Sequence, residues 1–240
     1  MWLRFPRYRG EMAVMLSLRS WTRPSTDARP LPDIGPLAVI IGVVLVANLP
    51  SLLGWVTTNP LVLNAGIASP GGGVLPGVPY IDPSAGFITQ ALGHLVALDW
   101  LHGHIPWWNP FEAMGTPLAG EMNSGAFFPP TLLLVFHDGL LYLRVFLEAA
   151  AGIATFFLLR KLQVDRTLAI VGGIAFALCG SFAWDANAPI RPIALLPLCL
   201  LGVETALSAA REARPGGWAL LAVALALSIL AGFPETALID

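Results

Sequence analysis

The residues best suited to chemistry in this chain are the carboxylates of one long segment, residues 57–139, which contains five acids and no lysine or arginine. A carboxylate can take a proton from a reacting group, and it can accept a hydrogen bond from a hydroxyl. A solvated loop also carries acids with no further purpose, so each of them has a plain structural explanation as well. The five acids are Asp82, Asp99, Glu112, Glu121 and Asp138.

Asp82 and the histidines that follow it can be explained without catalysis. Asp82 stands directly before Pro83, an arrangement typical of a helix N-cap and first turn. Asp99, His102 and His104 have the spacing of metal ligands, but a metal site needs three or four converging ligands with supporting hydrogen bonds. We therefore predict no cofactor; a divalent metal ion is compatible with the spacing but has no other support.

Two arginines lie within or beside apolar runs, where a charge is costly. Arg144 and Glu148 are four residues apart and share one face of a helix, which predicts a local ion pair. Arg191 is the only basic residue of the short link at 185–191.

Composition indicates that lipid is the solvent for most of the chain. Of its 240 residues, 56% are hydrophobic and only 12% are charged, whereas soluble domains carry about 25% charged residues. The net charge of −2 gives no reason to expect a nucleic-acid partner. Cys179 and Cys199 lie inside apolar runs, where we expect small buried side chains and no disulfide.

Five apolar runs approach the length of about 20 residues with which a helix crosses the hydrocarbon core of a bilayer. They lack the period-two alternation of barrel strands, so helices are the expected structure. The sequence thus predicts an all-α polytopic membrane protein with transmembrane helices at residues 37–56, 140–159, 167–184, 192–209 and 218–238.

The basic residues predict one orientation in the bilayer. Eleven of the thirteen lie in every second connection between the predicted spans, and these connections all face one side of the bilayer. Six are before residue 37, three at 160–166 and two at 210–217. Because cytoplasmic loops are rich in lysine and arginine, we expect the N-terminus in the cytoplasm. The predicted parts are a cytoplasmic basic tail (1–36), a first transmembrane helix (37–56), an extracytoplasmic loop (57–139) and a helix bundle (140–240).

The long outer loop is expected to be folded, because loops beyond about 15 residues are usually functional or disordered and this one is rich in aromatic residues. Residues 80–103 carry an apolar stripe at helical spacing, which predicts a helix lying at the membrane interface. Residues 127–136 predict a second, shorter interfacial helix. The stripe consists of Ile88, Leu92, Leu95 and Leu98.

Several motifs occur in an order that resembles the bacterial YfhO-type membrane proteins. A Gly-x-x-Pro-x-Trp-Asn-Pro block is followed by Gly-x-Pro-Leu and an aromatic–proline pair. Residues 172–182 and 231–238 fit later parts of the pattern, with Glu235 where the family often has Gln, and the resemblance covers residues 37–240. The matching residues of the first blocks are Gly103, Pro106, Trp108, Asn109, Pro110, Gly115, Pro117, Leu118, Phe128 and Pro129.

That resemblance implies a GT-C-like glycosyltransferase fold with its active site at the extracytoplasmic face of the bacterial plasma membrane. Such enzymes move a sugar from a polyprenyl-phosphate-linked donor to a cell-envelope glycopolymer or lipid acceptor. By its position in the pattern, Asp82 would be the catalytic base. Family members are much longer, so this chain is expected to be the N-terminal portion of such an enzyme.

The same resemblance suggests which residues would bind substrate. A lipid phosphate outside the membrane needs a cation, and two arginines are available there; acidic and amide side chains of the loop could hold sugar hydroxyls. The paired tryptophans suit either a binding surface or simple anchoring at the interface. A membrane transporter, or a non-catalytic membrane scaffold or remnant, stays open as the alternative. The expected substrate-binding residues are Arg144, Arg191, Glu112, Glu121, Asn123, Trp107 and Trp108.

Overall fold

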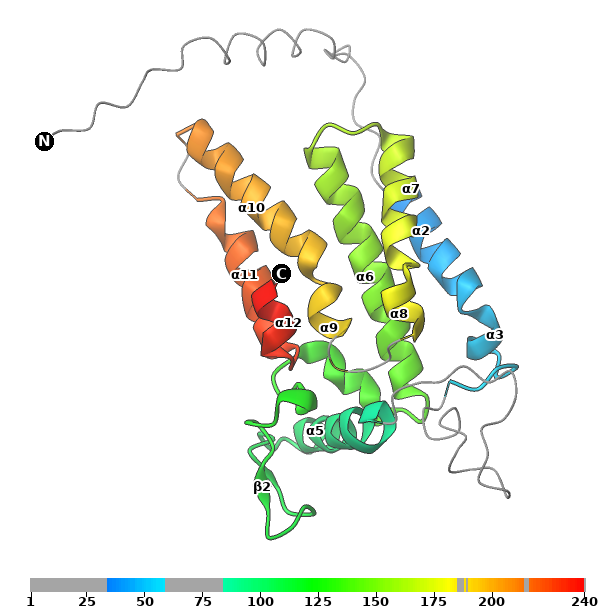
Figure 1. Cartoon of the computed structure of the whole chain (residues 1–240), viewed down its shortest axis with the longest axis vertical. Coiled ribbons are helices and arrows are strands. Elements are labelled where there is room, and N and C mark those ends of the chain that lie inside the picture. The colour runs from blue at the N-terminus through cyan, green and yellow to red at the C-terminus, as the bar shows by residue number, and fades with distance from the viewer. Residues whose placement is uncertain (1–33, 59–83, 185–187, 189, 214–215, 240) are drawn as a thin grey trace, which may run out of the picture. The chain divides into compact units, whose positions relative to one another are not determined.

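The computed structural model describes residues 34–58, 84–184, 188, 190–213 and 216–239 (Figure 1). The chain divides into two compact units, Met1–Gly35 and Pro36–Asp240. The first unit contributes only the start of one helix to the described residues, so the fold presented below is that of the second. Its described part is mostly helical, in agreement with the predicted fold class.

Within the described ranges, two helices are long and apolar enough to cross a membrane. The first is α6, Gly139–Lys161, whose 23 residues extend over about 35 Å, more than the hydrocarbon thickness of about 30 Å. The second runs over Arg191–Arg211 and comprises the short helix α9, Ile190–Ile193, and α10, Leu196–Arg211. These two correspond to the predicted spans at 140–159 and 192–209.

The other three predicted spans are interrupted helices. Helix α2, Ile34–Ala47, is followed by α3, Leu49–Leu52. Proline at the start of a helix lacks the N–H that would continue the preceding one, and Pro50 and Pro234 each stand at such a start. The remaining segments are α7, Arg166–Ala177, with α8, Gly180–Trp184, and α11, Trp218–Leu230, with α12, Pro234–Ile239.

Glycines bring the helices into close contact. Gly152 of α6 and Gly173 of α7 face each other, and a Cβ built on Gly173 would lie 2.7 Å from the carbonyl oxygen of Gly152. Gly202 of α10 meets α11 in the same way, since its Cβ would lie 2.6 Å from the Cα of Leu221. Small residues at helix crossings are typical of helix packing in lipid, where close van der Waals contact replaces the hydrophobic effect.

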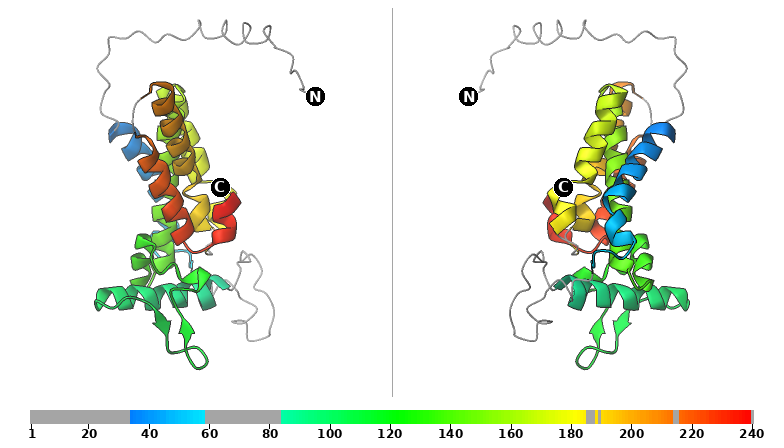
Figure 2. Two further views of the ribbon diagram at one scale, coloured as in Figure 1. Left: turned by 90° about the vertical axis from the view of Figure 1, so that its left-hand side faces the viewer. Right: turned by 90° about the vertical axis from the view of Figure 1, so that its right-hand side faces the viewer.

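Residues 84–138, called the outer layer below, fold across one end of these helices. Helix α5, Ala91–Leu101, continues the π-helix η2, Ala85–Gln90, and crosses the direction of α6 (Figure 1). Figure 2 shows a hairpin projecting from the side of α5 that is opposite the bundle. The remaining elements are β1, Trp108–Asn109, and β2, Thr116–Pro117, which pair antiparallel, and the 3-10 helices η3, Met122–Ser124, and η4, Pro129–Val135.

The predicted helix at 80–103 is confirmed over residues 85–101, and its most buried positions lie beside the predicted stripe. Leu92 and Leu95 of the stripe are partly buried against the cluster around Val96. Ile88 of the predicted stripe is 39% exposed, whereas Val96 and Ala97 are fully buried. Gly93 allows α5 to press directly on η4, because a Cβ there would overlap the side chain of Leu134. Close packing against η4, which only the fold supplies, therefore selected the side with small residues.

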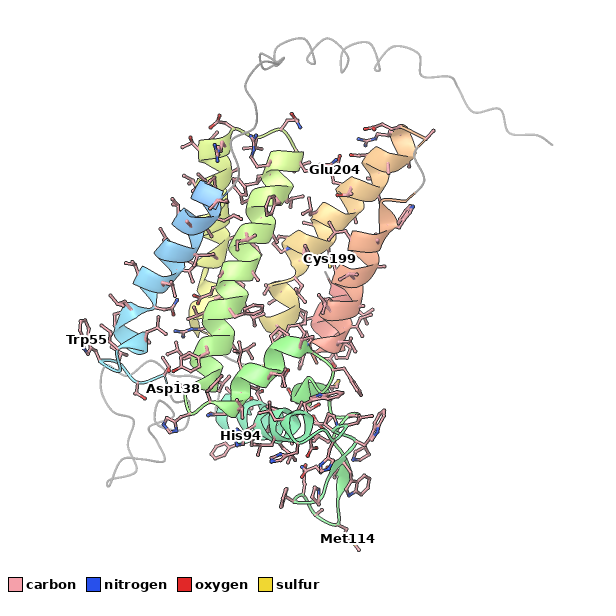
Figure 3. The ribbon with its side chains drawn as sticks, turned by 180° about the vertical axis from the view of Figure 1, so that it is seen from behind. Trp55, His94, Met114, Asp138, Cys199 and Glu204 are labelled. Atoms are coloured by element: carbon pink, nitrogen blue, oxygen red, sulfur yellow. The ribbon has the colours of Figure 1, made fainter. Side chains whose placement is uncertain are left out.

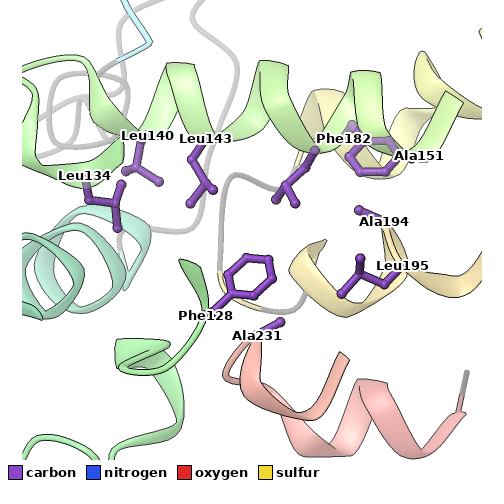
Figure 4. Packing of buried hydrophobic residues seen from close by; sticks show 10 residues of the cluster. Phe128, Leu134, Leu140, Leu143, Ala151, Phe182, Ala194, Leu195 and Ala231 are labelled. Carbon is purple, nitrogen blue, oxygen red and sulfur yellow. The ribbon is translucent and has the colours of Figure 1, made fainter. Parts of the chain in front are cut away.

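The main hydrophobic cluster joins the outer layer to the helix bundle. Phe128 and Leu134 of the outer layer pack with Leu143 of α6 and, across the cluster, with Leu195 and Ala231 (Figure 4). The second interfacial helix predicted at 127–136 is a 3-10 helix, η4, which buries Thr131 and Leu134 and contacts both α5 and α6. Residues 84–138 are an integral layer of the fold.

Charge is segregated between the two ends of the helices. The link from α6 to α7 and the link from α10 to α11 lie at the end away from the outer layer (Figure 1). Arg160, Lys161, Arg166 and Arg211 lie at that end, at the termini of their helices. The outer layer contains no lysine or arginine.

Candidate functional site

The predicted catalytic base, Asp82, lies outside the described residues, as do all of 59–83. Its role stays a prediction. The described outer layer begins at Ser84, two positions after Asp82 in the sequence.

Arg144 lies in a compensated polar cluster between α2 and α6. Its Nε is 3.6 Å from Oε1 of Glu148, which confirms the ion pair predicted from their spacing. Asn48, at the end of α2, accepts a hydrogen bond from Arg144 Nη2 at 2.7 Å and donates one to Glu148 Oε2 at 2.5 Å. Nε of Arg144 makes no hydrogen bond, but the carboxylate at ion-pair distance compensates the charge, and Nη2 is taken by the amide. Arg144 is therefore a weaker candidate for binding a phosphate than an arginine without a counter-ion.

Asn48 was missed by sequence reasoning, although one signal could have found it. A lone asparagine within an apolar run requires polar partners when it is buried. Asn48 is 6% exposed and meets that requirement entirely through α6 and the carbonyl of Val44.

Arg191 has the opposite surroundings. The sequence placed it in an outer link, but the structure buries it at the start of α9 with 1% of its surface exposed. Its Nη1 donates a hydrogen bond to the carbonyl oxygen of Ala231 at 3.3 Å, and its Nη2 has no hydrogen-bond partner. Within the described part of the chain no carboxylate lies within ion-pair distance of it.

Three segments meet around this guanidinium and form what we call the Arg191 junction: Ser124–Gly125, Arg191 and Ala231–Gly232. Gly125 has a left-handed backbone (φ 57°), and a Cβ there would overlap Arg191 Nη1. Gly232 (φ 100°) approaches the backbone of Gly125, since its own Cβ would lie 3.1 Å from the Gly125 nitrogen. Ser124 is also buried, and its hydroxyl has no hydrogen-bond partner.

An uncompensated buried guanidinium is energetically expensive. The desolvation penalty of one buried ion is several kcal/mol even after relaxation of its surroundings. Its planar N–H groups match the oxygens of a carboxylate or a phosphate, which would lower that cost. Arg191 therefore gives this junction the chemistry of an anion site, and Ser124, next to Gly125 in the chain, carries a second buried polar group without a hydrogen-bond partner.

The acidic side chains of the outer layer are used within the layer. Glu112 Oε2 accepts long hydrogen bonds from Asn109 Nδ2 and Thr116 Oγ1, both at 3.4 Å, and so closes the hairpin. Glu121 Oε1 accepts from the backbone nitrogen of Asn123 at 3.4 Å and from its Nδ2 at 3.1 Å. These contacts account for the two acids structurally.

The predicted tryptophans belong to the same layer and serve different contacts. Trp107 meets Phe127 edge to face with ring centroids 5.6 Å apart. Trp108 covers Gly115, whose Cβ would overlap the indole ring. Met114 is fully exposed at the tip of the hairpin (Figure 3).

The predicted site residues therefore fall into three groups and do not form one site. Among the described residues, no hydrogen bond or ion pair links Glu112 or Glu121 to Arg144 or Arg191. In the same ranges, no group of three or more His, Cys, Asp or Glu side chains is arranged to hold a metal ion. The ring of His102 instead caps its own helix through the carbonyl oxygen of Leu98 at 2.7 Å.

Comparison of the chain with protein-family models, with curated proteins and with solved structures found no match. The resemblance to YfhO-type proteins stays a prediction, and the function has to be argued from the arrangement of the residues themselves.

Proposed function

We propose that this chain is a membrane glycosyltransferase, or part of one, that moves a sugar from a polyprenyl-phosphate-linked donor to a cell-envelope glycopolymer or lipid acceptor. The reaction would take place on the extracytoplasmic face of the bacterial plasma membrane, with the N-terminus in the cytoplasm. The observation that carries the proposal is Arg191, a buried cation without a counter-ion among the described residues.

The donor phosphate is the group that Arg191 would bind. A phosphate carries its charge on oxygens that guanidinium N–H groups fit well, and an apolar lipid tail suits the helices around it. Arg191 belongs to an apolar run, and it contacts the outer layer at Gly125. A phosphate at the junction would thus lie where a membrane lipid can meet a soluble acceptor.

The segregation of charge supports the orientation. Arg160, Lys161, Arg166 and Arg211 lie at helix ends on the side away from the outer layer, as expected if that side is cytoplasmic. The outer layer would then face the periplasm or cell exterior, where lipid-linked sugars are used.

Asp82 is proposed as the base on the basis of the family resemblance. The acceptor hydroxyl oxygen would bond to the anomeric carbon of the sugar while the bond from that carbon to the donor phosphate breaks. Asp82 would take the hydroxyl proton, and the polyprenyl phosphate would leave. A positioned base of this kind contributes about 10²–10⁴-fold to the rate.

Binding of a polyprenyl phosphate to the full chain in lipid nanodiscs tests the proposal. We expect Arg191→Gln to weaken binding at least tenfold (about 1.4 kcal/mol) and to leave binding of the matching polyprenol, which has no phosphate, unchanged. Arg211→Gln is the matched control, because it removes an exposed charge at the opposite end. Equal binding by Arg191→Gln and the wild type would refute the role of Arg191.

A second measurement separates binding from chemistry. Asp82→Asn should abolish sugar transfer from the lipid-linked donor while the lipid still binds. If transfer continues at the wild-type rate, Asp82 is not the base.

A transporter is the second candidate, and the interrupted helices favour it. Transporters often bind substrate where membrane helices are broken, and three of the predicted spans are broken here. The short helices α3, α8, α9 and α12 lie in the half of the bundle nearer the outer layer, whereas transporter sites lie near the bilayer midplane (Figure 1). Flux of a labelled lipid-linked sugar across sealed vesicles, without transfer to an acceptor, would favour transport.

A further inference from the structure

An open hollow with a mainly apolar lining and three polar side chains lies within the outer layer, apart from the Arg191 junction. It has a volume of about 350 Å³ and is formed by η2 and α5 on one side and by the end of η4 and the residues after it on the other. Two of the four histidines of the chain line it, His94 from α5 and His137 from the link before α6, together with Gln90. Leu134 and Phe136 provide apolar walls.

The ring of His94 is held in one tautomer. Its Nδ1 lies 2.8 Å from the carbonyl oxygen of Leu134. A carbonyl oxygen can only accept a hydrogen bond, so Nδ1 must carry the proton. In the neutral ring Nε2 is therefore unprotonated and presents a lone pair.

Capping of η4 explains only one side of this ring. The last carbonyls of a helix need donors from outside it, and the imidazole supplies one to Leu134. The bond leaves Nε2 with no protein hydrogen-bond partner in the described ranges. An imidazole whose Nδ1–H is fixed by a backbone carbonyl, with Nε2 free, is the arrangement typical of a histidine that ligates a metal.

We propose that this hollow binds a divalent transition-metal ion, such as Zn²⁺, through His94 Nε2 and a ring nitrogen of His137. Imidazole is the commonest protein ligand for such ions, and it suits Zn, Cu and Ni. The amide oxygen of Gln90 is the third polar group lining the hollow. Water would occupy the remaining positions, so the ion would be exchangeable and open to a further ligand.

The chemistry of the hollow sets what the bound ion could do. None of the described residues that line it is an aspartate or glutamate, so these residues would leave the ion its full positive charge. An ion of that kind attracts anionic groups and polarises the oxygens bound to it. This site is independent of Arg191 and of the proposed glycosyl transfer, because it shares no residue with the junction.

Metal binding to the full chain, purified without a polyhistidine tag, tests the proposal. We expect titration calorimetry with Zn²⁺ to give one site per chain. His94→Ala and His137→Ala should each lower the affinity for Zn²⁺ by about tenfold or more. Tenfold is the lower end of the loss seen when a residue that only hydrogen-bonds to a metal ligand is removed. The matched controls are His102→Ala and His104→Ala, which remove exposed imidazoles that do not line the hollow.

A second variant guards against misfolding, since His94 also caps η4. His94→Asn can still donate to the Leu134 carbonyl oxygen, but it lacks the imidazole ligand; it should keep the thermal melting point of the wild type and lose the metal. Electron paramagnetic resonance of bound Cu²⁺ should show two imidazole nitrogens in the wild type and one in His94→Asn.

Three results would overturn the site. They are the absence of Zn²⁺ binding by the wild type, equal losses in the two control variants, and unchanged affinity in His94→Asn.

Discussion

Arg144 and Arg191 both lie within candidate membrane spans, and the groups that contact their guanidinium differ. Arg144 has a carboxylate at 3.6 Å and an amide at 2.7 Å, from its own helix and from the end of α2. Arg191 has one backbone carbonyl at 3.3 Å and an unpartnered nitrogen. Arg144 is thus contacted by side chains that complement its charge, whereas Arg191 is contacted by a backbone carbonyl.

This difference separates a structural role from a binding role. A buried ion pair satisfies its own charges, and removing either partner exposes the cost of the other. A buried cation without a partner already bears that cost, which an arriving anion would relieve. Arg144 therefore connects two helices, whereas Arg191, as we propose, binds a phosphate.

The largest effect is expected at Glu148, the counter-ion of Arg144. Glu148→Gln removes the counter-charge of Arg144, and we expect a loss of about 3 kcal/mol in the free energy of unfolding, the lower end for a disrupted buried pair because 17% of the Arg144 side chain is exposed. Equilibrium unfolding in mixed detergent micelles measures it. Glu204→Gln is the control, because its pair with Arg211 at 3.7 Å is largely exposed and contributes at most about 1 kcal/mol. Equal losses for the two variants would contradict the contrast.

Gly125 tests whether backbone packing holds the Arg191 junction. Gly125→Ala places a Cβ against Arg191 Nη1 at a left-handed backbone position, and we expect a loss of about 2 kcal/mol in the free energy of unfolding. The same unfolding measurement applies. Gly120→Ala should change stability by less than about 0.5 kcal/mol, since its Cβ would meet Pro117 at an ordinary 3.6 Å. An unchanged free energy of unfolding in Gly125→Ala would show that the junction adjusts to the added Cβ at little cost.

Replacing Arg191 tests the comparison with Arg144 by whether the free energy of unfolding rises or falls. Arg191→Met keeps an apolar stem and removes the uncompensated charge, so we expect the free energy of unfolding to rise by about 1 kcal/mol while binding of a polyprenyl phosphate is lost. Thermal melting with and without the lipid phosphate measures both effects. A variant that is destabilised as strongly as Glu148→Gln would mean that Arg191 has a structural partner after all.

The parts of the fold that were predicted correctly depend on neighbours in the chain. The helix at 85–101 and the Arg144–Glu148 pair follow from spacings of three and four residues, which a helix converts into shared faces. The breaks after α2 and α11 were not predicted, because the length of the apolar runs alone indicates continuous helices. Pro50 and Pro234, which lack the N–H needed to continue a helix, mark both breaks in the sequence.

The parts that could not be predicted depend on contacts between distant segments. The most buried face of α5 lies beside the predicted stripe, because Gly93 packs on Leu134, and no local pattern encodes the proximity of these two residues. His94 and His137 line one hollow for the same reason.

The sequence by itself determined where the apolar runs lie, which ends of the helices carry basic residues, and that Arg144 and Glu148 share a face, because each of these follows from composition or helical period. Only the tertiary structure decided which arginine has no counter-ion among the described residues. Asn48 reaches Glu148 across 100 positions of the chain and Arg191 reaches Ala231 across 40, and such pairings exist only once the helices have packed.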